Sequence, residues 1–141
     1  MGNLIYKYKL KSIKSAPEFS YDGLITYCKV ISVYDGDTVT ILIKNNGVIY
    51  TEKCRLLGID TPEMRGGDDE SKKRAVEAKE YVVKKVLNKI VRIKCDKFEK
   101  YGRLLGTFYP NGLKRESLND ELIRVGHAYA YDGGTKQTQK K

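Results

Sequence analysis

In the segment Arg55-Leu56-Leu57-Gly58-Ile59-Asp60-Thr61-Pro62-Glu63, a predicted strand runs into a rigid, charged turn around which the rest of the chain is organised. Its leucines and isoleucine predict a largely buried backbone. Pro62 fixes its own φ at about −65° and biases the preceding residue toward extended geometry, so the chain must turn. We expect Arg55, Asp60 and Glu63 to project from a rigid edge, where carboxylates serve as hard oxygen ligands. An exposed acidic turn after a core strand is the alternative interpretation.

The residues before this stretch predict a three-stranded meander. Residues 24–34, 38–44 and 48–57 are rich in β-branched and aromatic residues and are typical of strands. Asp35-Gly36-Asp37 predicts a tight turn between the first two strands, and Asn45-Asn46-Gly47 predicts a hairpin between the next two. Carboxylates therefore fall at one turn and at one strand end of the meander.

The residues after the stretch predict two helices and two more strands. A helical stripe of alanine and valine predicts a helix at about residues 70–88, and strands follow at 90–96 and 104–109. Ser117 is the expected N-cap of a second helix over 118–125. This order predicts an α+β, mainly β, domain: a five-stranded OB-fold barrel with two packed α-helices.

The two ends of the chain differ from the middle in composition. Residues 1–22 form a predicted basic arm, in which leucine and tyrosine alternate with lysine at the period of a strand. It is either an edge strand or a loose arm that contacts phosphates. We expect the domain to span residues 23–131 and to be followed by a polar tail, residues 132–141, without a third, C-terminal helix.

Charge and cysteine content restrict the partners and the compartment. The chain has 27 Lys and Arg against 18 Asp and Glu, a net charge of +9, which favours a polyanionic partner: nucleic acid first, an anionic membrane surface second. The membrane interpretation rests on net charge alone, so no membrane partner is expected. Three cysteines without C-x-x-C spacing predict buried thiols in a reducing compartment. Because no transmembrane window or signal peptide is evident, we expect an intracellular protein.

Acidic and basic side chains gather at the predicted strand ends. Asp37 and Asp60 fall at the same end of adjacent strands, with Asp35 and Glu63 close by in sequence. Two carboxylates and a backbone carbonyl in an irregular turn suit calcium or magnesium rather than zinc.

Two arginines and two tyrosines extend this candidate site. Arg55 and Arg103 could grip a phosphodiester through their guanidinium forks, or could simply form ion pairs with the same carboxylates. Tyr129 and Tyr131 are either core residues or a stacking platform for a base.

Three motifs in register resemble one family. Residues 33–39, the stretch 55–63 and Lys100-Tyr101-Gly102-Arg103 are similar to the staphylococcal nuclease (thermonuclease) family, and the similarity continues through residues 118–126. The resemblance covers about residues 24–131. It implies an OB-fold nuclease that uses Ca²⁺ to cleave DNA and RNA with little sequence preference. In that family water attacks phosphorus and the 5′ oxygen leaves, giving 3′-phosphate products.

The resemblance also implies roles for individual residues. Asp37, Asp60 and the Thr61 carbonyl match the metal ligands, and Asp35 matches an acidic residue that supports the hydration of the ion. Further matched residues contact water or substrate: Glu63 activates or positions the attacking water, Arg55 and Arg103 hold the scissile phosphate, Lys100 and Tyr101 lie near a neighbouring phosphate, and Tyr129 or Tyr131 stacks on a base.

The expected protein is therefore a monomeric Ca²⁺-dependent endonuclease acting on single-stranded or locally opened DNA and RNA. The alternative is a non-catalytic OB-fold module that binds nucleic acid or protein. The complete set Asp37, Arg55, Asp60, Glu63 and Arg103 favours the enzyme, since a pure binder needs no carboxylates facing a phosphate.

Overall fold

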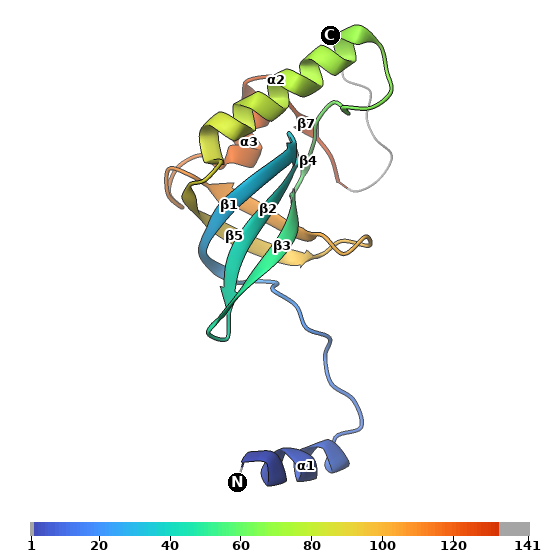
Figure 1. Ribbon diagram of the computed structural model, residues 1–141, viewed down its shortest axis with the longest axis vertical. Coiled ribbons are helices and arrows are strands. Elements are labelled where there is room, and N and C mark those ends of the chain that lie inside the picture. The colour runs from blue at the N-terminus through green and yellow to red at the C-terminus, as the bar shows by residue number, and fades with distance from the viewer. Residues whose placement is uncertain (1, 133–141) are drawn as a thin grey trace.

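Five strands close into a barrel that carries two helices at one end (Figure 1). The computed structural model describes residues 2–132. Its elements, in chain order, are α1 Gly2–Ser12, β1 Ile25–Asp35, β2 Thr38–Asn45, β3 Val48–Leu56, β4 Ile59–Asp60, α2 Asp69–Val86, β5 Ile90–Phe98, β6 Leu104–Tyr109, α3 Leu118–Arg124 and β7 Tyr129–Ala130.

The barrel has the strand order β1-β2-β3-β6-β5, and β5 pairs back with β1 to close it. Only the β3–β6 ladder is parallel; the other pairs in the barrel are antiparallel. The predicted five-stranded barrel with two packed helices is confirmed, and its strand boundaries lie within two residues of the predicted ones.

The β2–β3 hairpin forms where the sequence predicts it. Asn46 and Gly47 have φ angles of 51° and 83°, the left-handed pair that a two-residue type I′ turn requires. Asn45 pairs with Val48 across the turn, so the register is fixed at the hairpin and carried to the far end, where Thr38 pairs with Arg55. The hairpin thus brings Arg55 alongside the Asp35–Asp37 turn.

Alternating side chains fill the interior of the barrel. Val39, Ile41 and Ile43 of β2 are buried, as is Phe108 of β6. The helix α2 covers the barrel with its predicted apolar stripe, Ala75, Ala78, Val82 and Val86. Cys28, Cys54 and Cys95 are free and buried, as predicted.

One buried amide fixes the position of the turn that follows β3. Asn119, in the first turn of α3, donates from Nδ2 to the carbonyl oxygens of Leu57 and Gly106, at 2.9 and 3.0 Å. Its Oδ1 accepts from the Phe108 amide at 3.1 Å. The N-cap Ser117 is confirmed, because its hydroxyl accepts from the Asp120 amide. The helix therefore holds the backbone that leads into Asp60.

The structure corrects the strand prediction at the N-terminal end. Residues 2–12 form the helix α1 and not an edge strand. In a closed barrel each strand already has two neighbours, so a sixth strand finds no free edge there, and the segment satisfies its backbone groups within a helix. Sequence analysis also missed the two-residue ladder between β4 and β7. The predicted tail, apart from Asp132, and any C-terminal helix fall in residues 133–141, outside the described residues.

Between residues 2 and 132, none of the helices combines the length and the apolarity that crossing a membrane requires.

Candidate metal and phosphate site

The tight turn between β1 and β2 packs directly against the segment that follows β4. A Cβ atom at Gly36 would lie 2.9 Å from Thr61 Cγ2 and 3.0 Å from Ala78 Cβ, so only glycine fits. Asp37 lies beside this contact, with Oδ2 accepting from the Thr61 amide at 3.2 Å. The close approach at Gly36 therefore brings the two halves of the candidate site together.

Arg55 joins the two buried carboxylates. Its Nη2 lies 3.6 Å from Asp37 Oδ2 and 3.4 Å from Asp60 Oδ1, and its Nη1 donates to the Ile59 carbonyl at 2.8 Å. The side chain is only 13% exposed. The predicted convergence of Asp37 and Asp60 is thus present, and so are the ion pairs that the alternative interpretation of Arg55 required.

Asp35 and Asp37 lie in the same turn, and their pKa values shift in opposite directions. Burial, followed by the hydrogen bond and the charge of Asp37, raises the pKa of Asp35 to about 7. Burial alone would also raise the pKa of Asp37, but the hydrogen bond with Asp35 and the charge of Arg55 lower it overall. The two carboxylates repel each other in this turn, and a divalent cation bound beside them would reduce the repulsion.

The donor set fits a hard cation in its chemistry. Asp37, Asp60 and Thr61 are all buried and all supply oxygen, the ligand atom that Ca²⁺ prefers. Within residues 2–132 no three carboxylate, imidazole or thiol groups converge as a ready-made metal cluster. A cation bound here would therefore complete its coordination with backbone carbonyl, water and substrate oxygens.

Arg103 is held in place by a residue that sequence analysis missed. Glu99 accepts from Arg103 Nε and Nη2, both at 3.2 Å, and from the amides of Tyr101 and Arg103 at 3.1 and 3.0 Å. Burial alone would raise the pKa of Glu99, but these hydrogen bonds from Arg103 lower it overall. The feature of the sequence that could have identified Glu99 is its position just before Lys100-Tyr101-Gly102-Arg103 in the β5–β6 connection.

Thr38 is a second residue that sequence analysis missed. Its hydroxyl donates to Asp37 Oδ1 at 3.0 Å and accepts from Arg103 Nη1 at 3.3 Å. Arg103, Thr38 and Asp37 therefore form a continuous chain of hydrogen bonds. This chain links the β5–β6 connection to the carboxylates.

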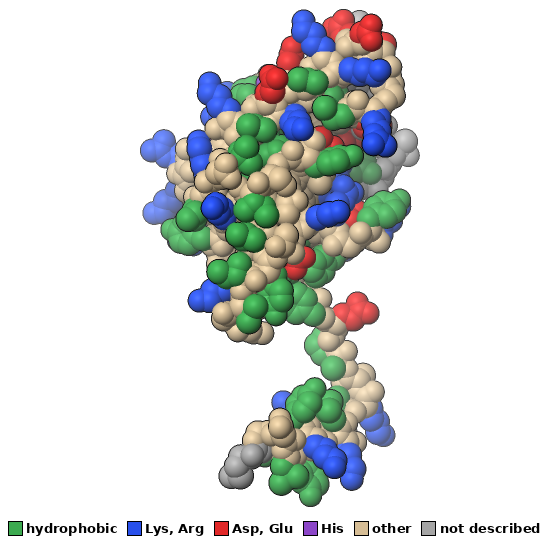
Figure 2. Space-filling model, viewed as in Figure 1, with side chains coloured by type: hydrophobic (Ala, Val, Ile, Leu, Met, Phe, Trp, Pro, Cys, Tyr) green, Lys and Arg blue, Asp and Glu red, His purple; other side chains and the backbone are tan. Residues whose placement is uncertain are grey.

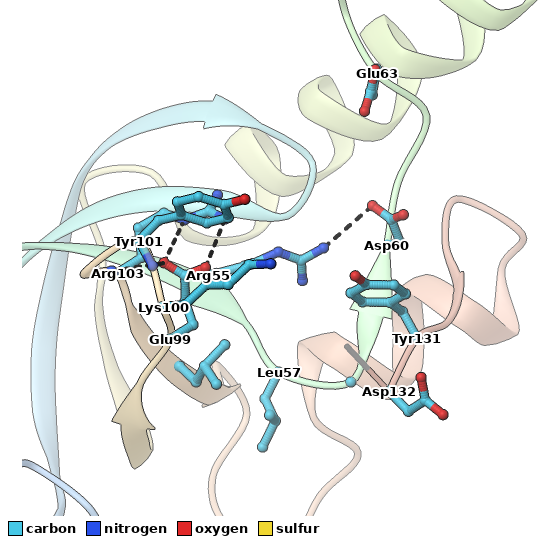
Figure 3. Close-up of a pocket in the computed structure, with 12 residues that line it drawn as sticks. Arg55, Leu57, Asp60, Glu63, Glu99, Lys100, Tyr101, Arg103, Tyr131 and Asp132 are labelled. Carbon is cyan, nitrogen blue, oxygen red and sulfur yellow. Dashed lines mark hydrogen bonds and ion pairs between the residues drawn. The ribbon is translucent and has the colours of Figure 1, made fainter. Parts of the chain in front are cut away.

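A cleft of about 800 Å³ opens beside these groups. Figure 3 shows Arg55 reaching across it toward Asp60, with Tyr131 beneath Asp60 and the β5–β6 connection on the opposite side. The lining residues are Arg55, Leu57, Gly58, Asp60, Glu63, Glu99, Lys100, Tyr101, Arg103, Leu105, Tyr131 and Asp132. Asp35, Asp37, Thr61 and Tyr129 do not line it.

The two candidate tyrosines occupy different places. The Tyr131 ring lines the cleft, with the Arg55 guanidinium carbon 5.1 Å from its centroid. Tyr129 pairs with Asp60 in the β4–β7 ladder, and its hydroxyl donates to Asp60 Oδ2 at 3.4 Å. Tyr131 is therefore placed to meet a ligand, whereas Tyr129 orients a carboxylate.

The remaining predicted residues lie at the rim of the cleft. Tyr101 is exposed, with Lys100 Nζ 5.1 Å from its ring centroid. Glu63 is exposed on the segment between β4 and α2, and Figure 3 shows it beyond Asp60 and away from the arginines. The structure thus brings the arginines and aspartates together and sets Glu63 apart from them.

Comparison with known proteins agrees with this arrangement. The family model described as "Staphylococcal nuclease homologue" matches residues 53–141. A thermonuclease from Staphylococcus hyicus is 31% identical over 95% of this chain and 77% of its own length. An uncharacterized protein of Methanocaldococcus jannaschii is 34% identical over 74% of this chain and 59% of its own length. An uncharacterized endonuclease of Haemophilus influenzae is 33% identical over 74% of this chain and 52% of its own length.

The chain thus spans little more than half of two of these relatives and most of the third. The family match begins in β3 and includes Arg55, Asp60, Glu63 and Arg103. Together with the closed five-stranded barrel, it supports one assignment. This chain belongs to the staphylococcal nuclease homologue family.

Proposed function

We propose that this chain is a calcium-dependent nuclease that hydrolyses phosphodiester bonds of DNA and RNA with little sequence preference. The observation that carries the proposal is the position of Arg55, whose Nη2 lies within 3.4 Å of Asp60 and 3.6 Å of Asp37 at the edge of a cleft that also holds Arg103. The thermonuclease and endonuclease named among its relatives support the same activity.

Asp37, Asp60 and the Thr61 carbonyl are the residues that would hold Ca²⁺, with Asp35 supporting its hydration. The burial of these three groups and their oxygen donors fit that ion. Bound there, Ca²⁺ supplies Lewis-acid polarisation of a phosphoryl oxygen. Arg55 already contacts both carboxylates, so it holds them in place and remains next to any phosphate bound beside them.

The two arginines bind the phosphodiester and stabilise the charge that develops on it. Arg55 approaches from β3 and Arg103 from the β5–β6 connection, and both line the cleft. Guanidinium groups donate paired hydrogen bonds to phosphate oxygens and keep their charge at any working pH. Because Glu99 and Thr38 fix the guanidinium of Arg103, little reorganisation is needed when charge builds up.

Glu63 positions the attacking water and accepts its proton. The water oxygen forms a bond to phosphorus, the bond from phosphorus to the 5′ oxygen breaks, and the 5′ oxygen leaves as a hydroxyl after taking up a proton from solvent. The products are a 3′-phosphate end and a 5′-hydroxyl end. Glu63 is exposed on the segment after β4 and lines the same cleft as the arginines, so it borders the space in which a bound phosphate would lie.

Tyr131, Lys100 and Tyr101 hold the strand on either side of the scissile bond. Tyr131 presents its ring to the cleft as a stacking surface that accepts any base, and the other two lie near a neighbouring phosphate. A base that stacks on Tyr131 has to leave the stack of neighbouring bases, so single-stranded or locally opened substrates are favoured. The net charge of +9 adds affinity that does not depend on sequence.

Incubation of a labelled single-stranded DNA and of the matching RNA with calcium, with magnesium and with chelator tests this function. The expected result is cleavage of both with calcium only, leaving 3′-phosphate ends. Cleavage with magnesium only would contradict the assigned ion, and 5′-phosphate ends would contradict the leaving group. A folded protein that binds DNA without cleaving it would instead be a non-catalytic OB-fold module.

The role of Glu63 has its own test. Glu63→Gln removes the acceptor for the proton and should abolish turnover while calcium binding and thermal unfolding stay unchanged. Glu77→Gln, a substitution on α2 outside the cleft lining, is the control and should keep full activity. An active Glu63→Gln enzyme would remove this residue from the mechanism.

A further inference from the structure

The helix α1 stands away from the barrel (Figure 1), and its apolar side chains are exposed. It has no buried residue. Its large apolar residues are among the most exposed in the described chain, with Ile5 at 68%, Tyr8 at 66% and Tyr6 at 62%. Exposed apolar side chains gathered on one element mark a surface that binds something else.

Apolar side chains occupy most of the surface of the helix, and lysines occupy a narrower part of it. Tyr6, Leu10 and Ile13 recur at intervals of four and three residues, so they form one stripe along the helix. Ile13 continues the last turn, because its amide donates to the Lys9 carbonyl. At 100° per residue, Lys9 lies on one border of this stripe, and Lys7 and Lys14 lie on the other.

The charge around this stripe has a single sign. The chain carries Lys7, Lys9, Lys11 and Lys14 and has neither aspartate nor glutamate before Glu18. Figure 2 shows blue and green side chains on the visible face of α1 and no red ones. A partner for this helix must therefore combine negative charge with a place for aliphatic and tyrosine side chains.

A lipid interface meets both conditions, whereas a nucleic acid meets only the first. A phosphate backbone would pair with the lysines and leave Leu10 and Ile13 in water. In a bilayer surface the aliphatic groups enter the acyl boundary, tyrosine lies at headgroup level, and lysines extend to the anionic headgroups. We propose that the exposed apolar surface of α1 docks this protein on the surface of an anionic phospholipid bilayer.

The position of α1 is compatible with an accessible cleft. Tyr21 is buried against the barrel and its hydroxyl donates to Glu52 at 2.8 Å, so the chain is anchored to the barrel at this residue. The residues between α1 and Tyr21 tether the helix to that anchor. In Figure 1, α1 lies at one end of the long axis, and β4, which contributes Asp60 to the cleft, lies toward the other end. A bilayer contacted by α1 leaves the cleft open to solvent.

Co-sedimentation of the full chain with phosphatidylcholine vesicles, with and without phosphatidylserine, tests the docking. Binding is expected with phosphatidylserine only, and Leu10→Ser/Ile13→Ser should weaken it about tenfold or more. The matched control Val48→Ser/Ile49→Ser removes two exposed apolar residues from the β2–β3 hairpin, outside α1, and should leave binding unchanged. No binding to either vesicle, or equal losses in the two double variants, would overturn the proposal.

The lysines give an independent test. Each lysine near an anionic surface strengthens binding about fivefold, so Lys7→Gln/Lys9→Gln should weaken vesicle binding by roughly twenty-five-fold. The same variants are titrated with a single-stranded oligonucleotide in chelator. If oligonucleotide binding falls and vesicle binding does not, α1 is a nucleic-acid arm and the membrane proposal is wrong.

Discussion

Arg55 connects the chemistry of the site to the fold at the scale of single residues. Its position is set by the pairing with Thr38 in β2, and its guanidinium reaches Asp37, Asp60 and the Ile59 carbonyl. One buried cation thus offsets part of the negative charge of two buried carboxylates that would otherwise be costly to desolvate. The arrangement holds both carboxylates close together, as a shared divalent cation would require.

Glu99 positions Arg103, and its substitution should slow turnover without unfolding the protein. Glu99→Gln keeps the shape of the side chain but loses the charge-assisted pair with Nε and Nη2 of Arg103. A lost hydrogen bond of this kind corresponds to about 1.5–3 kcal/mol, or roughly a tenfold to hundredfold fall in kcat, with little change in KM.

Steady-state kinetics and thermal unfolding of the same samples check this prediction. The control is Glu70→Gln, which breaks another ion pair of the same spacing, with Arg74, on the exposed surface of α2. It should leave kcat unchanged. Equal kcat values for Glu99→Gln and the wild-type chain would mean that Arg103 needs no positioning.

At the scale of elements, the contact between α2 and α3 depends on a buried carboxylate. Glu121 in α3 accepts a hydrogen bond from the Tyr81 hydroxyl and pairs with Lys85 Nζ at 2.9 Å, both on α2. Burial alone would raise the pKa of Glu121, but these two partners lower it overall below its usual 4.5. The contact also holds α3, whose Asn119 anchors the backbone before Asp60.

The stability that Glu121 contributes should depend on pH in a defined direction. Because its pKa is lower in the folded state than in the unfolded state, the contribution is complete above the unfolded value of 4.5 and is lost as pH falls through the folded pKa. At neutral pH, Glu121→Gln should lower the free energy of unfolding by about 1–3 kcal/mol. The difference between variant and wild type should shrink as pH drops below 4.5.

Urea unfolding at several pH values measures this difference. Glu116→Gln serves as the control, since Glu116 pairs with Arg124 on the exposed surface and should contribute nothing measurable. A difference for Glu121→Gln that stays constant down to pH 3, or that grows as pH falls, would contradict the assignment of the shift to Tyr81 and Lys85.

Elements with a strong local signal were predictable from the sequence. The alternation of Val39, Ile41 and Ile43 and the turn at Asn46 and Gly47 fix the β2–β3 hairpin through local forces alone. The helix α1 was not predictable, since the alternation of its leucines and tyrosines with lysine favours a strand. The pattern does not show that the closed barrel lacks a free edge with which such a strand could pair. The β4–β7 ladder has two residues per strand and no periodicity to detect.

The candidate site was predictable in its composition and less so in its contacts. The meander places Asp37 and Asp60 at one end of adjacent strands, and the structure has both beside Arg55. Glu99 and Thr38 were not predicted from the sequence, because their contacts with Arg103 depend on how the β5–β6 connection folds back on the barrel. The separation of Glu63 from the arginines likewise follows from the path of the segment after β4.

At the scale of the whole molecule, the net charge of +9 should govern the affinity for single strands. In chelator, the logarithm of the binding constant should fall linearly with the logarithm of the salt concentration. Lys100→Gln removes a cation from the cleft and should make the slope shallower by about 0.7.

Fluorescence anisotropy with a labelled oligonucleotide gives these slopes. Lys44→Gln is the control, because Lys44 is exposed on β2 next to the turn of the β2–β3 hairpin and does not line the cleft. It should leave the slope close to that of the wild type. Equal changes for both variants would show that the strand is held by charge spread over the surface and has no defined path through the cleft.

The central claim is that Asp37 and Asp60 hold the calcium ion on which cleavage depends. The most direct measurement is the turnover of single-stranded DNA across a calcium series, for the wild-type chain and for Asp37→Asn, with folding verified for both. Wild-type turnover should saturate with calcium, whereas Asp37→Asn should need far more calcium and reach a much lower maximum. Wild-type turnover that is unaffected by calcium, or an Asp37→Asn curve that coincides with it, would show that these aspartates do not hold a calcium ion needed for cleavage.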